Sequence, residues 1–205
     1  MSQLDTRVAR PAARRQRWNA TDLGLIAVFA AIVAGSALVP GIPLAAGVPI
    51  TVQTLAVMLT GMVLGPGRGF AAVGLYTLLG LAGLPIFSGG RSGLGILAGP
   101  SAGYILGFTI AAAVVGFLTV QVLRRTTRRR AAWLFAAAMV TSILFIHSLG
   151  VAGIMLNTGA TWQQAFLADL AFYPGDIVKN ILAALIAVTL HRAFPDILVR
   201  RAARQ

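Results

Sequence analysis

Residues 23–39 read LGLIAVFAAIVAGSALV, a run without a charged side chain. Thr21 and Asp22 before the run are typical of a helix start, and Pro40 just after it is typical of a helix end. A helix needs about 20 predominantly apolar residues to cross the hydrocarbon core of a bilayer. The stretch therefore predicts a membrane-spanning helix. The arginine-rich start of the chain and the apolar run after it resemble a signal peptide. Further apolar runs follow, however, so we expect this helix to be retained.

The composition of the whole chain agrees with this interpretation. Of 205 residues, 58% are hydrophobic and only 11% are charged, whereas an average soluble domain has about 25% charged residues. The formal net charge of +12 would ordinarily suggest a nucleic-acid partner, but the arginines lie in clusters between the apolar runs. We therefore predict a protein embedded in the lipid bilayer, with no nucleic-acid partner. The lack of cysteine excludes disulfides and thiolate metal sites.

The apolar runs predict an all-α membrane protein with six transmembrane helices. The predicted helices span residues 23–39, 50–64, 70–84, 102–123, 131–156 and 175–190. Residues 85–99, between the third and fourth helices, are too rich in glycine for a regular helix and too apolar for a solvated loop, so they predict an irregular outer loop over a cavity. The expected domains are a basic tail over 1–20, a six-helix membrane domain over 21–192 and a basic tail over 193–205.

The distribution of arginine predicts how the helices are oriented. Six alternating helices place fifteen of the sixteen arginines, all except Arg91, on one side of the membrane. These arginines lie in the two tails, in the turn around Arg68 and in the loop between helices four and five. The positive-inside rule then predicts that both termini are cytoplasmic, in the inner (cytoplasmic) membrane of a cell. The connections over residues 41–49, 85–101 and 157–173 are predicted to face outside.

Five charged residues lie outside the arginine clusters, and we look for function among them. They are Asp22, Arg91, Asp169, Asp176 and Lys179. Asp22 is most simply the N-cap of the first helix. Asp176 and Lys179, the only lysine, are three residues apart at the outer end of the last helix, so they share one helix face. They form either an internal ion pair that holds the helix or part of an outward-opening pocket for a polar ligand.

Further polar side chains lie near the predicted outer connections. Arg91 is surrounded by glycines, which allow the backbone to approach a ligand closely, although a solvated loop arginine would look the same in the sequence. Taken singly, Gln53, Tyr104, Asn157 and Trp162 are each more often an interface anchor or a satisfied polar group than a ligand contact. Together with the aspartate and lysine of the last helix, they predict a compact polar ligand site capped by aromatic side chains.

Signals for other chemistries are weak or absent. The chain has no P-loop motif, so it is not expected to hydrolyse ATP by that route. His147 and His191 lack the spacing of metal ligands, so structural roles are favoured and no metal is predicted. Asp169 is expected in a connection, which argues against an intramembrane aspartyl protease. Small residues including Ala27 and Ala31 predict close packing of the first helix, either within the bundle or against a partner protein.

Five separated motifs together resemble one protein family. They are VPITVQTLAV (48–57), LGPGRG (64–69), GLPIFSGG (83–90), GPSAGYILGF (99–108) and PGDIVK (174–179). In this order they closely resemble the BioY family, the biotin-specific substrate-capture subunits (S components) of energy-coupling-factor transporters. The likeness covers roughly residues 20–192. One departure is Ser101-Ala102 where the family pattern has Thr-Gly, a change that keeps the hydroxyl group.

The resemblance implies a function that the residues alone do not decide. It implies a six-helix subunit that captures biotin from the extracellular side, without cofactor or enzymatic activity, and works with a membrane coupling subunit and two ATPases. Asp176 is then expected to contact the ureido N–H groups of biotin, and either Lys179 or Arg91 its carboxylate. Ala27 and Ala31 are expected to face the coupling subunit. The residues alone leave open a self-contained secondary carrier for a small carboxylate-bearing solute, an intramembrane enzyme and a homo-oligomer.

Overall fold

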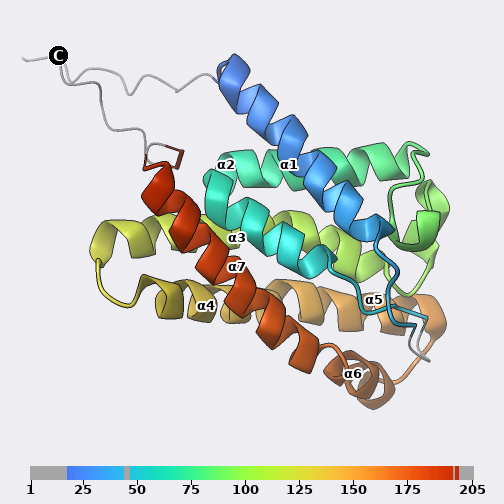
Figure 1. Cartoon of the computed structure of the whole chain (residues 1–205). Helices are drawn as coiled ribbons and strands as arrows, with labels where there is room; N and C mark the ends of the chain where they lie inside the picture. The colour runs from blue at the N-terminus through green and yellow to red at the C-terminus, as the bar shows by residue number, and fades with distance from the viewer. Residues whose placement is uncertain (1–17, 44–46, 196, 199–205) are drawn as a thin grey trace, which may run out of the picture.

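Helices account for nearly all of the chain that the computed structural model describes, which is residues 18–43, 47–195 and 197–198 (Figure 1). In chain order they are α1 (Ala20–Leu38), α2 (Gln53–Leu81), α3 (Ala102–Arg125), α4 (Arg130–Thr141), α5 (Ser148–Thr158), α6 (Trp162–Leu170) and α7 (Tyr173–Ala193). Two 3-10 turns, η1 (Ser88–Gly90) and η2 (Leu94–Ala98), form the irregular loop predicted before α3. The predicted all-α fold is confirmed. The two predicted basic tails lie mostly outside the described residues.

Helix α2 folds back on itself and forms two of the predicted helices. Its chain bends at Gly65, where φ is 80° and ψ is −177°, a conformation that glycine adopts without steric cost. The Gln53 amide nitrogen lies 2.6 Å from the Tyr76 hydroxyl oxygen, although 23 residues of straight helix would separate them by about 35 Å. The two arms therefore lie side by side and antiparallel (Figure 1). Buried residues make up 67% of the most apolar part of α2, against 28% in α1, so this hairpin is central to the bundle.

The fifth predicted helix, residues 131–156, is continuous but irregular. It runs from Arg130 to Thr158, and η3 (Ser142–His147) between α4 and α5 is π-helical. Single π-helical turns widen a helix locally and occur often at functional sites. This turn ends at His147, which is buried inside the bundle.

The connection predicted over residues 157–173 contains a helix that the sequence analysis missed. Helix α6 starts with a capping box in which Thr161 accepts a hydrogen bond from the Gln164 backbone and Gln164 accepts one from Thr161. Asp169 was expected in a connection, and this was wrong. It lies in the last turn of α6 with none of its surface exposed, because α6 packs one face against the bundle.

The described arginine clusters lie at one end of the bundle. The start of α1, the bend of α2, the α3–α4 connection and the end of α7 meet there (Figure 1). Asp22 was expected to be the N-cap of the first helix, which was wrong. Asn19 is the N-cap, and Asp22 is the third helical residue of a capping box. Asp22 also pairs with Arg68 near the bend, with Nη1 and Oδ1 3.1 Å apart, and Arg68 donates a second bond to the Ile197 carbonyl.

The outer surface of the bundle is apolar, as a lipid-facing surface should be. Leu182 and Leu185 on α7 and Val28 on α1 are among many large hydrophobic side chains that are exposed, and soluble proteins rarely expose such continuous apolar surface. Five helical stretches are long and apolar enough to cross a membrane, one of them the bent α2. Ala27 and Ala31 lie on the exposed face of α1, whereas Ala30 is buried against the bundle.

Candidate ligand-binding site

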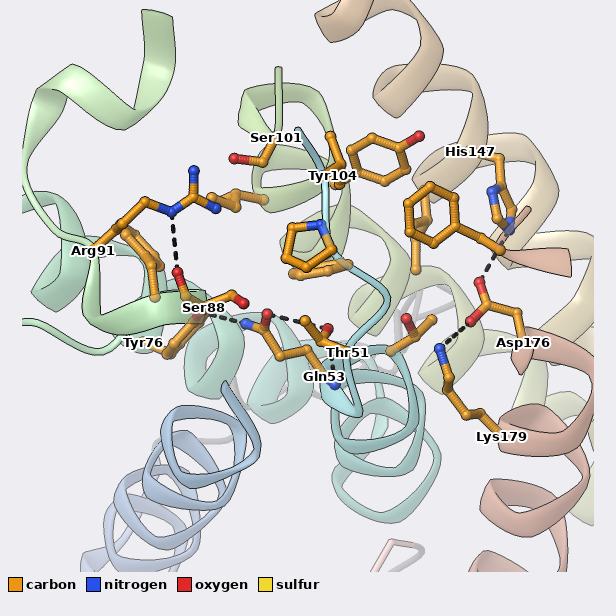
Figure 2. A pocket seen from close by; sticks show the side chains of 18 residues that line it. Thr51, Gln53, Tyr76, Ser88, Arg91, Ser101, Tyr104, His147, Asp176 and Lys179 are labelled. Carbon is orange, nitrogen blue, oxygen red and sulfur yellow. Dashed lines mark hydrogen bonds and ion pairs between the residues drawn. The ribbon is translucent and has the colours of Figure 1, made fainter. Parts of the chain in front are cut away.

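A cavity lies at the opposite end of the bundle from the bend of α2. It is enclosed by the two arms of α2, the start of α3, η1, η3 and the start of α7 (Figure 2). Five of the six residues predicted to bind ligand line this cavity, namely Gln53, Arg91, Tyr104, Asp176 and Lys179. The rest of the wall is largely apolar and includes Val48, Ile105, Phe108, Ile146 and Phe172. The cavity therefore suits a ligand with polar groups at separate points and an apolar middle.

Asp176 and Lys179 are both an ion pair and part of the cavity wall. The Lys179 Nζ lies 2.6 Å from Asp176 Oδ1, and the two side chains are 13% and 3% exposed. Pro174 precedes them in the first turn of α7, where proline is favoured. The internal ion pair considered from the sequence is present, and the pair also faces the cavity (Figure 2). The positive charge of Lys179 is thus neutralised before any ligand arrives.

Behind this pair, a buried hydrogen-bonded chain links three more elements. His147 Nε2 lies 3.2 Å from Asp176 Oδ2, and His147 Nδ1 lies 2.9 Å from Asp169 Oδ1. The Tyr104 hydroxyl donates to the same Asp169 oxygen over 2.7 Å. The chain joins α3, η3, α6 and α7. Sequence reasoning missed the roles of His147 and Asp169, because their proximity depends on the π-helical turn and on α6.

Arg91 reaches the cavity from the irregular loop. Its Nε donates to the Ser88 carbonyl over 3.0 Å, and its guanidinium points into the space near Ser101 (Figure 2). Among the described residues no carboxylate pairs with Arg91. Ser101 is 6% exposed, and its hydroxyl has no hydrogen-bond partner within the described chain. Although it occupies the N-cap position of α3, its side chain does not cap the helix. Ser101 is a site residue that the sequence analysis left out.

Gln53 and Tyr76 form a second polar patch on the wall. The Gln53 amide donates to the Tyr76 hydroxyl oxygen over 2.6 Å, so the Tyr76 hydroxyl keeps its own proton for another acceptor. Phe87 packs edge-on against the Tyr76 ring, with centroids 5.5 Å apart. Tyr76 and Phe87 were not predicted as site residues. The Gly-Leu-Pro-Ile-Phe motif at residues 83–87 contained the only signal for Phe87.

Asn157 and Trp162 do not line this cavity. The Asn157 amide donates to the carbonyls of Leu97 and Gly99 over 2.9 and 2.8 Å, so it anchors the irregular loop to the end of α5. Trp162 is 55% exposed and stacks on Phe166, with ring centroids 5.1 Å apart. A tryptophan in this position is typical of the membrane interface.

The described residues contain no group of three or more histidine, aspartate or glutamate side chains arranged to hold a metal. Both imidazole nitrogens of His147 are already occupied by carboxylates. His191, at the arginine-rich end, contacts the Met62 carbonyl through Nε2 at 2.9 Å. The polar groups that line the cavity can bind an organic ligand by hydrogen bonds and charge.

Comparison with known proteins matches residues 11–196 to the model of the BioY family. The chain belongs to the BioY family. Among BioY relatives, the biotin transporter BioY of Rhodobacter capsulatus is 42% identical over 86% of this chain and 96% of its own. The biotin transporter BioY of Rhizobium etli is 38% identical over 85% of this chain and 95% of its own.

A solved structure extends the BioY likeness to three dimensions. The S-component for biotin from an ECF-type ABC transporter superposes with a TM-score of 0.79 at 27% identity, covering 84% of this chain and 91% of the other. The helices described above therefore share the fold of that S-component.

Proposed function

We propose that this protein captures biotin in the cavity between α2, α3, η1 and α7 and passes it to an ATP-driven energising module. The observation that carries the proposal is the charge arrangement of the cavity. On one side of an apolar wall lies the Arg91 guanidinium, which pairs with no carboxylate of the described chain. On the other side lies the neutralised ammonium–carboxylate pair of Lys179 and Asp176. Biotin has a carboxylate, an apolar thiophane ring and a ureido group in matching order. The BioY relatives named biotin transporters support the same ligand.

Arg91 is the better candidate for the biotin carboxylate. Lys179 already has a carboxylate partner at 2.6 Å, so a second anion there would compete with Asp176. Among the described residues the Arg91 side chain pairs with no carboxylate and donates a hydrogen bond to the Ser88 carbonyl, and guanidinium binds carboxylate in a two-pronged geometry. The unpartnered Ser101 hydroxyl beside it can donate one more hydrogen bond to the same anion (Figure 2).

The opposite wall suits the ureido group. Asp176 accepts hydrogen bonds, as the two ureido N–H groups require, and the Lys179 ammonium can donate to the ureido oxygen. Asp176 and Lys179 hold each other, and His147 also holds Asp176, so little ordering entropy is lost when the ligand binds. Phe172 and Ile146, also in the wall, would cover the thiophane ring.

The orientation of the protein follows from its arginines. With the arginine-rich end in the cytoplasm, the cavity opens toward the outer side of the inner membrane, where biotin enters. The exposed small residues Ala27 and Ala31 on α1 would then face a membrane coupling subunit, which in turn contacts the ATPases. The structural relative described as the S-component of an ECF-type ABC transporter supports this assembly.

Calorimetric titration of the purified full chain in detergent tests the ligand and its orientation. Wild-type protein is expected to bind biotin more tightly than biotin methyl ester, which lacks the negative charge. Arg91→Ala should lose this preference and bind both about equally, whereas Arg192→Ala at the other end of the chain should behave like wild type. Wild-type protein that binds no biotin would contradict the proposed function, and an unchanged preference in Arg91→Ala would contradict the carboxylate assignment.

A further inference from the structure

His147 lies between the carboxylates of Asp169 and Asp176. These three side chains form a cluster that must hold a minimum number of protons. Nδ1 faces Asp169 Oδ1 at 2.9 Å and Nε2 faces Asp176 Oδ2 at 3.2 Å. A neutral imidazole carries a single N–H and presents a lone pair at its other nitrogen. A lone pair facing a carboxylate oxygen would be repulsive. Both contacts are therefore attractive only when two protons are shared among Asp169, His147 and Asp176.

With two protons the cluster is electrically balanced. Two carboxylates and an imidazolium carry a net charge of −1, and Lys179 beside Asp176 adds +1. The other titratable groups facing the histidine are Tyr104, which donates to Asp169, and Tyr173, whose ring stacks on the imidazole with centroids 4.5 Å apart. Both phenols are neutral. A neutral cluster is the arrangement that a buried, low-dielectric site favours, because uncompensated buried charge is costly.

Neither His147 nor Asp169, the two residues of the cluster that were not predicted, offers an unoccupied polar atom to the cavity. Asp169 Oδ2 has no hydrogen-bond partner among the described residues, but it is buried away from the cavity. Asp169 does not line the cavity and is completely buried. His147 lines it, but both ring nitrogens are occupied. Their polar contacts are with Asp176 and Tyr104, which do line the cavity. Any hydrogen-bonding effect they have on ligand binding must therefore pass through those two side chains.

We propose that His147 and Asp169 are positioning residues that hold Asp176 and Tyr104 in the geometry that binds biotin. This inference rests on the proposed function. Asp169 fixes the Tyr104 hydroxyl on one side and the His147 ring on the other. His147 in turn fixes the Asp176 carboxylate (Figure 2). Helix α6 thereby acts on the ligand site from behind, since it supplies Asp169.

A double-mutant cycle on biotin affinity tests this role, using the full chain in detergent. His147→Ala and Asp176→Ala should each weaken binding, the first by about tenfold because one charged hydrogen bond is lost. If the histidine acts through the aspartate, the double variant should bind no more weakly than Asp176→Ala alone. His191→Ala, which removes the other histidine at the far end, should bind as wild type. A double variant weakened by the product of both single effects would overturn the inference.

The pH dependence of biotin affinity is a second measurement, and a simple loss of packing would not change it. Wild-type affinity should fall as the pH rises far enough to remove the second proton, because one of the two histidine contacts then becomes repulsive. Asp169→Asn removes one of the two charges that require that proton, so its affinity should depend less on pH even if His147→Ala fails to fold. An unchanged pH profile in Asp169→Asn would overturn the inference. If wild-type protein binds no biotin, the proposed function is overturned as well. If wild-type protein binds biotin and the effects of His147→Ala and Asp176→Ala add in the double variant, only this inference is overturned.

Discussion

Each end of the bundle holds a buried aspartate paired with a cation, and the two pairs differ in what surrounds them. Asp22–Arg68 and Asp176–Lys179 have almost the same side-chain exposure, 5% and 13% in the first and 3% and 13% in the second. Within the described part of the chain, the other hydrogen bonds of Arg68 go to backbone carbonyls, those of Leu64 at 3.1 Å and of Ile197. Those contacts hold α1, the bend of α2 and the end of α7 together.

The Asp176–Lys179 pair lies beside other polar side chains and lines a cavity. Asp176 continues through His147 to Asp169 and Tyr104, and the same cavity contains the unpartnered hydroxyl of Ser101. The comparison teaches that an intramembrane ion pair alone does not distinguish structure from function. The distinction lies in whether the surrounding polar groups are satisfied by backbone or are left facing a cavity.

The largest effect is expected when the two aspartates are replaced separately. Asp176→Ala should weaken biotin binding about 100-fold, equivalent to about 3 kcal/mol, because a charged hydrogen-bond acceptor is lost. Asp22→Ala should leave affinity unchanged and lower the thermal unfolding midpoint, because Arg68 loses its buried carboxylate. Titration calorimetry and thermal unfolding in the same detergent measure both. Equal losses of affinity in the two variants would show that the two ends do not differ in function.

A smaller effect is expected from crowding the Tyr104 ring. A Cβ atom on Gly150 would lie 2.2 Å from the ring atom Cε1 of Tyr104, whereas one on Gly74 would meet nothing closer than 3.6 Å. Gly150→Ala should displace the ring, break its hydrogen bond to Asp169 and weaken biotin binding about tenfold. Gly74→Ala is the matched control and should bind normally. Normal binding by Gly150→Ala would mean that Tyr104 is not needed in its present position.

The smallest effect on affinity is expected on the exposed face of α1. Ala31→Trp should leave biotin binding unchanged and prevent co-purification with the coupling subunit, because a large side chain blocks close helix contact. Leu182→Trp, on the exposed face of α7, is the control and should still co-purify. If Ala31→Trp co-purifies with the coupling subunit at the wild-type level, α1 is not the docking face.

Much of the helical framework could be predicted from the sequence, including the break between the second and third helices at the Gly65 motif. Apolar runs and glycine are local signals, so these features need no knowledge of the neighbours. The N-cap of α1 was predicted at Asp22 and lies at Asn19. Aspartate and asparagine are both favoured at N-caps, and only the hydrogen bonds distinguish the two positions. Helix α6 was missed because it is short and its capping box lies in a polar connection.

The site was partly predictable for the same reason. The charges of Arg91, Asp176 and Lys179 are conspicuous in an apolar chain, and all three line one cavity. Asn157 looked similar in the sequence but holds the loop backbone. The roles of Arg91, Asp176 and Lys179 in binding biotin stay predictions.

By itself the sequence determined the apolar segments, the asymmetry of arginine and the residues whose charge needs an explanation, because hydrophobicity and charge belong to each residue wherever it lies. Only the tertiary structure decided which of those charges meet. The chain from Tyr104 through Asp169 and His147 to Asp176 joins four separate helical segments. It forms because a π-helical turn and the packing of α6 bring them within hydrogen-bonding distance, and such contacts depend on the fold as a whole.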